Sequence, residues 1–128
     1  YTRDTVLYAV DRTRHNDGLQ LNFALNYGSR HEILNAVKEM VTDIKDAKLS
    51  LDEVDEQHLS NYLYTADMPE PDLLIRTGGE KRLSNFLLWQ LAYSEFWFTD
   101  VPWPDFTERE FLLALDEYKQ RKRRYGGL

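Results

Sequence analysis

A short apolar run, Leu73-Leu74-Ile75, constrains the fold of this chain more than any other feature. Pro69 and Pro71 lead into the run, and a loop that contains Gly78-Gly79 follows it. A short and wholly apolar segment is typical of a buried strand in a parallel sheet. Parallel strands are joined by crossover connections, usually helices, so the run favours an α/β fold.

The remaining patterns fit alternating helices and strands. We expect helices over Thr2–Arg14, from Ser29 onward, from Ser50 to about Tyr62, over Leu83–Leu91 and after Thr107. We expect strands at Leu21–Leu25, where apolar and polar residues alternate, at Leu73–Ile75 and at Glu95–Phe98. The predicted fold class is therefore α/β, a mainly parallel sheet flanked by helices, in a single domain over residues 1–128. Three strands are few for such a sheet, so we expect part of the fold to be absent.

Helix starts and apolar faces carry their own signals. Capping-box signatures, a hydroxyl residue followed three positions later by glutamate, are Ser29/Glu32, Ser50/Glu53 and Thr107/Glu110. Apolar residues at helical spacing are Ile33, Val37, Met40 and Ile44 in the second helix, and Phe111, Leu115 and Tyr118 in the last.

Composition excludes several classes of protein. With 42% hydrophobic and 30% charged residues among 128, the chain is typical of a soluble globular protein. The longest apolar run is Phe86–Trp89, far too short to span a bilayer. The absence of cysteine excludes disulfides and favours a reducing, cytoplasmic compartment. A net charge of −6 argues against general nucleic-acid binding.

Positive charge is concentrated near the C-terminus, where five of the six residues 119–124 are lysine or arginine. Cations suit the C-terminal end of a helix, because the helix dipole is negative there. An anion-binding or membrane-surface segment is the alternative interpretation.

The loop after Leu73–Ile75 has the composition of a diphosphate site. Arg76 ends the strand, Gly78-Gly79 allow a tight turn, and Arg82 and Ser84 open the next predicted helix. Guanidinium groups bind phosphate oxygens bidentately, and the free N–H groups of a helix start attract anions. The spacing is not that of a Walker P-loop. The alternative is structural: the arginines pair with Glu80 and surface acids, and Ser84 only caps a helix.

Several blocks of sequence together resemble the cis-prenyltransferase family. They are Asn26-Tyr27-Gly28-Ser29-Arg30, the segment Arg76–Gln90, Ala92-Tyr93-Ser94-Glu95, Trp103-Pro104-Asp105-Phe106 and Arg124-Tyr125-Gly126-Gly127. They occur in the family's order over more than four-fifths of the chain. Ser29 is the one visible departure, because many members have glycine there.

The resemblance implies an enzyme that adds isopentenyl diphosphate to an allylic diphosphate, such as farnesyl diphosphate, with new double bonds in the cis configuration. It implies that Arg76, Arg82 and Ser84 hold the isopentenyl diphosphate head group, with Leu83 between them. We expect Glu80 and Asn85 to support this site.

The resemblance also implies a cofactor and a partner subunit. Glu95 matches a carboxylate that helps to bind Mg²⁺ beside the diphosphate; a plain carboxylate at a sheet edge is the alternative. Arg124 and Gly126 match a motif that reaches the diphosphate site across a homodimer interface, which favours the anion-binding interpretation of the basic segment.

Part of the catalytic centre is not in this sequence. The family's aspartate-containing loop, which holds the allylic diphosphate and supplies the main Mg²⁺ carboxylate, has no counterpart in these residues. We therefore expect the C-terminal part of a longer undecaprenyl diphosphate synthase, with no catalytic residue of its own and no activity alone. The expected role is supply of the cell-wall lipid carrier, in the cytoplasm, with peripheral membrane contact through the lipid product. A non-catalytic accessory subunit is the alternative, but such subunits usually lose the residues that match Arg76, Arg82 and Ser84.

Overall fold

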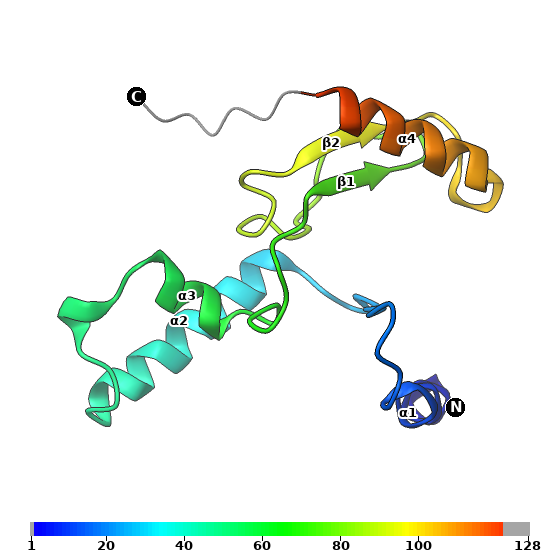
Figure 1. The fold of residues 1–128 in the computed structure, drawn as a ribbon. Coiled ribbons are helices and arrows are strands. Elements are labelled where there is room, and N and C mark those ends of the chain that lie inside the picture. Colours follow the sequence, from blue (N-terminus) through cyan, green and yellow to red (C-terminus); the bar gives the residue numbers. More distant parts are fainter. Residues whose placement is uncertain (1, 122–128) are drawn as a thin grey trace.

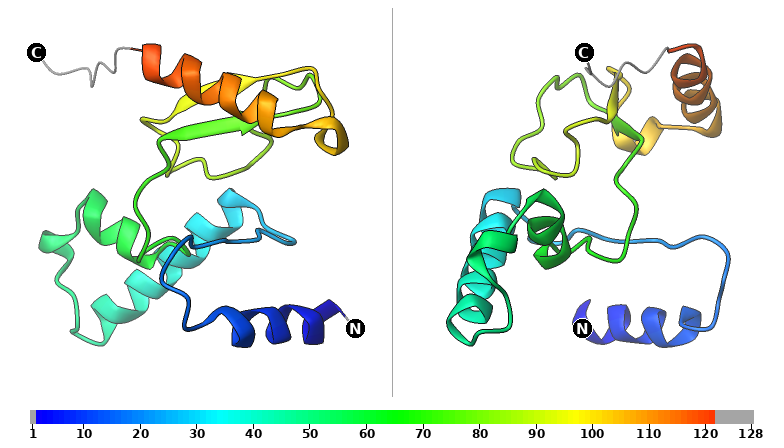
Figure 2. Two further views of the ribbon diagram at one scale, coloured as in Figure 1. Left: turned by 45° about the vertical axis from the view of Figure 1, so that its right-hand side comes forward. Right: turned by 60° about the vertical axis from the view of Figure 1, so that its left-hand side comes forward.

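The computed structural model describes residues 2–121 of the chain. In chain order the elements are α1 (Thr2–Thr13), α2 (Ser29–Lys45), the 3-10 turn η1 (Leu51–Glu53), α3 (Glu56–Tyr62), β1 (Leu73–Arg76), β2 (Glu95–Phe98), the 3-10 turn η2 (Trp103–Asp105) and α4 (Glu108–Gln120). Helices α2 and α3 lie together, and α4 lies across one face of the two strands (Figure 1). Both views in Figure 2 show α1 standing apart from the other elements. None of the helices in residues 2–121 is long and apolar enough to span a bilayer.

The two strands pair in parallel, as the sequence predicts. Leu73 is opposite Glu95 and Arg76 is opposite Phe98. A parallel pair requires a crossover connection, and residues 77–94 provide it. The α/β fold class is therefore confirmed.

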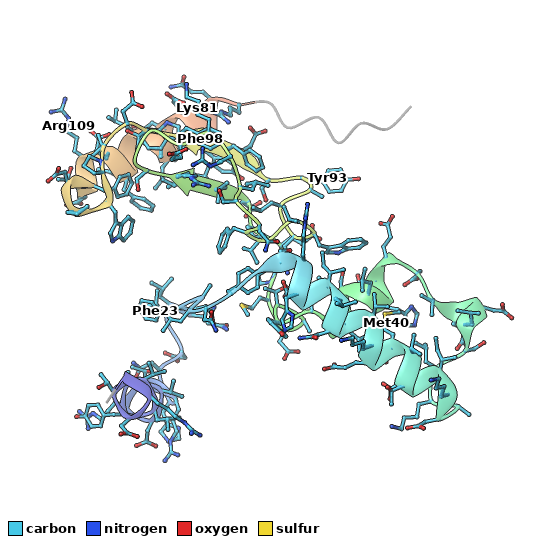
Figure 3. The ribbon with its side chains drawn as sticks, turned by 180° about the vertical axis from the view of Figure 1, so that it is seen from behind. Phe23, Met40, Lys81, Tyr93, Phe98 and Arg109 are labelled. Carbon is cyan, nitrogen blue, oxygen red and sulfur yellow. The ribbon has the colours of Figure 1, made fainter. Side chains whose placement is uncertain are left out.

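The third predicted strand is wrong. Residues 14–28 contain neither helix nor strand, and Leu21, Phe23 and Leu25 are 65–76% exposed. Figure 3 shows Phe23 on the segment that joins α1 to α2, away from Met40 in the α2–α3 pair. The physical reason is pairing: a strand needs a neighbouring strand for its backbone hydrogen bonds, and the described part of the chain places none beside this segment.

The buried core is small for a chain of this length. Its apolar members in the described residues are Ala36, Met40, Leu63, Leu91, Trp97 and Ala114. Many large apolar side chains stay exposed, including Leu7, Val10 and Tyr8 on α1. A 128-residue chain normally buries more of its apolar surface than this.

The N-terminus of α2 differs from its predicted capping box. Gly28, not Ser29, is the N-cap residue, and it makes no side-chain capping bond. Ser29 and Glu32 are instead fully buried, and both side chains bond to segments far away in the sequence. The capping-box signature therefore identified two structurally important residues, but their hydrogen-bond partners are not those of a helix cap.

The helix predicted from Ser50 to Tyr62 divides into two pieces. The Ser50/Glu53 capping box forms, but it closes only the 3-10 turn η1. Asp55 is then the N-cap of α3, and its carboxylate accepts a hydrogen bond from the His58 backbone N–H at 2.8 Å. This bond and the His58 ring lower the pKa of Asp55.

The last helix begins where the sequence predicts, with Thr107 as its N-cap, but the Thr107 side chain makes no capping bond. Its buried centre is Ala114, whereas Phe111 of the predicted apolar stripe is 44% exposed. Before the helix, Trp103 stacks on Phe106 with ring centroids 5.9 Å apart. Phe106 also meets the edge of buried Trp97 of β2, which anchors this turn to the sheet.

Candidate functional site

The loop after β1 folds back over the end of β2. The Gly78 N–H donates to the Val101 carbonyl and the Gly79 N–H donates to the Thr99 carbonyl, both at 2.9 Å. Both glycines have positive φ, 81° and 76°, a conformation that other residues adopt only with strain. A β-carbon on Gly79 would also lie 3.1 Å from Asp100 Oδ1. The predicted role of the glycines as turn formers therefore agrees with the geometry.

Arg76, Arg82 and Ser84 come together beyond the carboxyl end of β1. Arg76 Nη1 donates a hydrogen bond to the Arg82 backbone carbonyl, and it lies 3.4 Å from Ser84 Oγ. A hollow of about 220 Å³ opens here, lined by Leu74, Ile75, Arg76, Arg82, Leu83 and Phe86. Leu83, predicted to lie between the binding residues, is therefore part of the wall of this hollow.

The guanidinium of Arg82 is 66% exposed and pairs with Glu80, with Nη1 2.5 Å from Oε2. This is the ion pair that the structural alternative anticipates, but for Arg82 only; no pair between Arg76 and an acid is found in the described residues. An exposed ion pair contributes only about 0–1 kcal/mol. Arg82 can therefore exchange Glu80 for a phosphate at little cost.

The helix predicted over Leu83–Leu91 is wrong, because the described chain runs there in bends and turns. Ser84, Asn85 and Leu87 have φ values of 50°, 66° and 44°, in the left-handed region, which a right-handed helix cannot contain. The loop consequently offers no helix N-terminus to an anion. Any diphosphate bound here must rely on side chains and individual loop N–H groups.

Asn85, predicted to support the site, is bonded to the start of α2. Its backbone carbonyl accepts from the Ser29 N–H at 2.8 Å, and its side-chain carbonyl accepts from the Arg30 N–H at 2.9 Å. A β-carbon on Gly28 would lie only 2.8 Å from Asn85 Nδ2, so this approach requires glycine. The first N–H groups of a helix have no hydrogen-bond acceptor within the helix. Here Asn85 provides an acceptor for two of these groups, those of Ser29 and Arg30.

Sequence reasoning missed a buried network around Glu32. Its carboxylate accepts from the Tyr27 hydroxyl, from the Tyr64 backbone N–H at 2.8 Å and from Gln90 Nε2 at 3.2 Å. Burial and the hydrogen bond to Glu32 raise the pKa of Tyr27 to about 12. The Ser29/Glu32 spacing is the sequence feature that marks these residues, but it predicts a helix cap and not a buried network.

Glu95, the predicted Mg²⁺ ligand, lies at the opposite end of the strands from Arg76. It begins β2 opposite Leu73, so three residues, about 10 Å along a parallel strand, separate the two positions. Its carboxylate pairs with Arg121 Nη1 at 2.9 Å, and the same nitrogen donates to the Phe96 carbonyl at 2.8 Å.

Residues 2–121 contain no group of three or more histidine, aspartate or glutamate side chains that could together hold a metal ion. One carboxylate is compatible with an ion held mainly by substrate phosphates and water. The Arg121 pair would have to open first. The assignment of Glu95 to Mg²⁺ therefore stays a prediction, and Arg124 and Gly126 lie outside the described residues.

A family model described as "Putative undecaprenyl diphosphate synthase" matches residues 1–126. The chain belongs to this prenyltransferase family. An isoprenyl transferase from Oceanobacillus iheyensis is 58% identical over 128 residues, which are 100% of this chain and 51% of that protein. The chain thus spans about half the length of the curated relatives it matches.

Two solved prenyltransferase structures share the fold. Lavandulyl diphosphate synthase from Lavandula x intermedia, in complex with dimethylallyl diphosphate, superposes with a TM-score of 0.93 at 39% identity over 98% of this chain and 54% of that one. A Campylobacter jejuni protein described as "a probable undecaprenyl diphosphate synthase" gives a TM-score of 0.79 at 38% identity, over 98% of this chain and 56% of that one. The described arrangement is therefore that of roughly half of a prenyltransferase.

Proposed function

We propose that this chain is the isopentenyl-diphosphate-binding part of a cis-type prenyltransferase, an undecaprenyl diphosphate synthase. The whole enzyme would join isopentenyl diphosphate to an allylic diphosphate such as farnesyl diphosphate, on the cytoplasmic side, to supply the lipid carrier of cell-wall synthesis. The observation that carries the proposal is that Arg76 meets the Arg82 backbone and the Ser84 hydroxyl beyond the end of β1. The hollow beside them is lined by both arginines. Membership of the prenyltransferase family supports the substrate class.

The chemistry proposed for these residues is recognition of a diphosphate. Arg76, half-buried at the strand end, would exchange its bond to the Arg82 carbonyl for one to a phosphate oxygen. Arg82 would leave Glu80 and bind a second oxygen, because a multiply charged phosphate is a stronger partner than one exposed carboxylate. The Ser84 hydroxyl would donate a further bond. Leu83 and Phe86 would contact the apolar isopentenyl group from the wall of the same hollow.

Mg²⁺, when bound, would neutralise part of the charge of the isopentenyl diphosphate head group. In this proposal Glu95 provides one of its ligands after separating from Arg121, and the remaining ligands are phosphate oxygens and water. Arg124 and Gly126 would complete the site in a homodimer. The peripheral membrane contact proposed for the whole enzyme would arise through its lipid product.

Titration of the chain with isopentenyl diphosphate, followed by amide NMR shifts, tests the site directly. We expect shifts at Gly78, Gly79 and residues 82–85, and a loss of binding in Arg82→Ala. Lys81→Ala is the matched control, because it removes a neighbouring exposed cation of the same charge. Equal loss in both variants, or no shift in the unsubstituted chain, would refute the proposed site.

A further inference from the structure

The Ser29 hydroxyl connects the start of α2 to the loop after β1. Ser29 is fully buried in the first turn of α2, and its Oγ accepts a hydrogen bond from the Leu88 backbone N–H at 2.9 Å. The two residues are 59 positions apart in the sequence. Without this hydroxyl the Leu88 N–H would lose this acceptor.

This bond is one of three hydrogen bonds that join two consecutive residues at the start of α2 to the same loop. The other two join the backbone N–H groups of Ser29 and Arg30 to the carbonyl and side chain of Asn85. The contact thus ties the loop at Asn85 and at Leu88. Phe86 and Leu87 lie between these two positions, and Ser84 lies immediately before them.

The tied segment carries the backbone strain of the site. Ser84, Asn85 and Leu87 are non-glycine residues with positive φ, a conformation that persists only where surrounding contacts impose it. The Ser84 hydroxyl and the Arg82 carbonyl are the groups that meet Arg76. The positions of Ser84 and of the nearby Arg82 relative to Arg76 therefore depend on how firmly residues 84–88 are held.

We propose that Ser29 is a positioning residue for the diphosphate site: its buried hydroxyl holds the Leu88 N–H and thereby fixes the left-handed segment that places Ser84 and Arg82 beside Arg76. This inference rests on the proposed function for the identity of the ligand. Ser29 itself does not contact the hollow in which the ligand would bind.

The experiment compares Ser29→Ala and Ser29→Gly with the unsubstituted chain. Ser29→Ala keeps a β-carbon in the buried position and removes only the hydroxyl. Ser29→Gly removes the β-carbon together with the hydroxyl. We expect amide hydrogen exchange at Leu88 to accelerate roughly ten-fold in both variants, and the Kd for isopentenyl diphosphate to rise by roughly the same factor. Exchange at Ala36 and Met40 in the α2 core should stay unchanged.

Thr42→Ala is the matched control, because it removes an exposed hydroxyl that bonds to the Lys38 carbonyl on the same helix. It should alter neither the exchange at Leu88 nor the Kd. Asn85→Ala, combined with Ser29→Ala, should weaken binding by less than the product of the two single effects, because both substitutions release one loop. Circular dichroism establishes that each variant keeps its helices.

Two outcomes separate the inference from the proposed function. If Arg82→Ala abolishes binding but folded Ser29→Ala binds like the unsubstituted chain, Ser29 is structural only and the inference is overturned alone. A lower melting temperature with an unchanged Kd has the same meaning. If the unsubstituted chain binds no isopentenyl diphosphate, the proposed site is overturned and the inference with it.

Discussion

Arg82 is the residue on which the proposed site depends most. A chimera that joins this chain to the unmatched half of the Oceanobacillus iheyensis relative would allow steady-state kinetics. We expect Arg82→Ala to raise the KM for isopentenyl diphosphate far more than the KM for the allylic diphosphate. Losing a charge-assisted bidentate contact costs about 2–4 kcal/mol, or about 30- to 1000-fold in kcat/KM.

The conservative variant sharpens this measurement. Arg82→Lys should restore only part of the loss, because a point charge cannot reproduce the two-pronged contact of guanidinium with phosphate. Lys81→Ala again serves as the control. An equal rise of KM for both substrates in Arg82→Ala would return Arg82 to a role as the ion-pair partner of Glu80.

The raised pKa of Tyr27 predicts that the stability of the fold depends on pH in the alkaline range. Its pKa is raised to about 12 by burial and by the hydrogen bond to Glu32. The folded state therefore holds the phenol proton more tightly than the unfolded state, whose pKa is about 10. The resulting stabilisation is complete below pH about 10 and is lost as the pH rises towards about 12.

Denaturant unfolding at several alkaline pH values measures this effect. The free energy of unfolding should fall less steeply with pH in Tyr27→Phe than in the unsubstituted chain. The absorbance difference between the two proteins should show a phenol that ionises later than ordinary tyrosines. A normal titration for Tyr27 would mean that the Glu32 network does not form in solution.

Glu95 tests the cofactor prediction at the residue scale. In the active chimera, Glu95→Gln should increase the Mg²⁺ concentration needed for half-maximal rate, because it removes a ligand charge while nearly preserving shape. Glu117→Gln is the control, since Glu117 also approaches Arg121 but lies on the outer surface of α4. If both variants keep the normal Mg²⁺ dependence, Glu95 serves only to attach Arg121 to the sheet.

At the scale of elements, both the segment before α2 and α1 expose large apolar side chains. Residues 19–25 present a row of apolar side chains to solvent, and α1 presents another. Exposed apolar surface of this kind favours association. We expect the chain to self-associate at tens of micromolar, where weak dimers persist.

Sedimentation velocity provides the measurement. Phe23→Asp should shift the chain towards monomer, because it places a charge in the apolar row, whereas Asn22→Asp, on the polar positions of the same segment, should have little effect. A monomer at these concentrations in the unsubstituted chain would contradict the prediction.

At the scale of the whole molecule, the chain holds one proposed diphosphate site and matches half of a prenyltransferase. We expect no turnover of farnesyl and isopentenyl diphosphates by the purified chain. Ionisation of the allylic diphosphate needs its departing charge stabilised, and no residue here is assigned to that step. Activity should appear when the half of the Oceanobacillus iheyensis relative that this chain does not match is supplied covalently or in trans.

A product assay with both diphosphates and Mg²⁺ measures this. Each half alone and the mixture should be compared at equal concentration. Turnover by the chain alone would refute the division of labour between the two halves, because it would place the allylic site within these 128 residues.

The sequence alone determined the features that depend on neighbours along the chain. The apolar run with its flanking prolines and glycines located β1, the aromatic segment Glu95–Phe98 located β2, and Thr107 located the start of α4. The grouping of Arg76, Arg82 and Ser84 was also predictable, because a strand end and a tight glycine turn bring residues of one short loop together. The family resemblance pointed to the same loop.

Tertiary structure decided everything that depends on distant partners. The alternation at residues 21–25 could not reveal whether a neighbouring strand exists to pair with it. Ser29 and Glu32 have partners 59 and 58 positions away, which no local signature specifies. The left-handed residues of the loop replaced the predicted helix because contacts with α2, not local propensity, fix the backbone at Asn85 and Leu88. Local patterns predict the conformations that residues adjacent in the sequence favour, but long-range hydrogen bonds determine which of these conformations form.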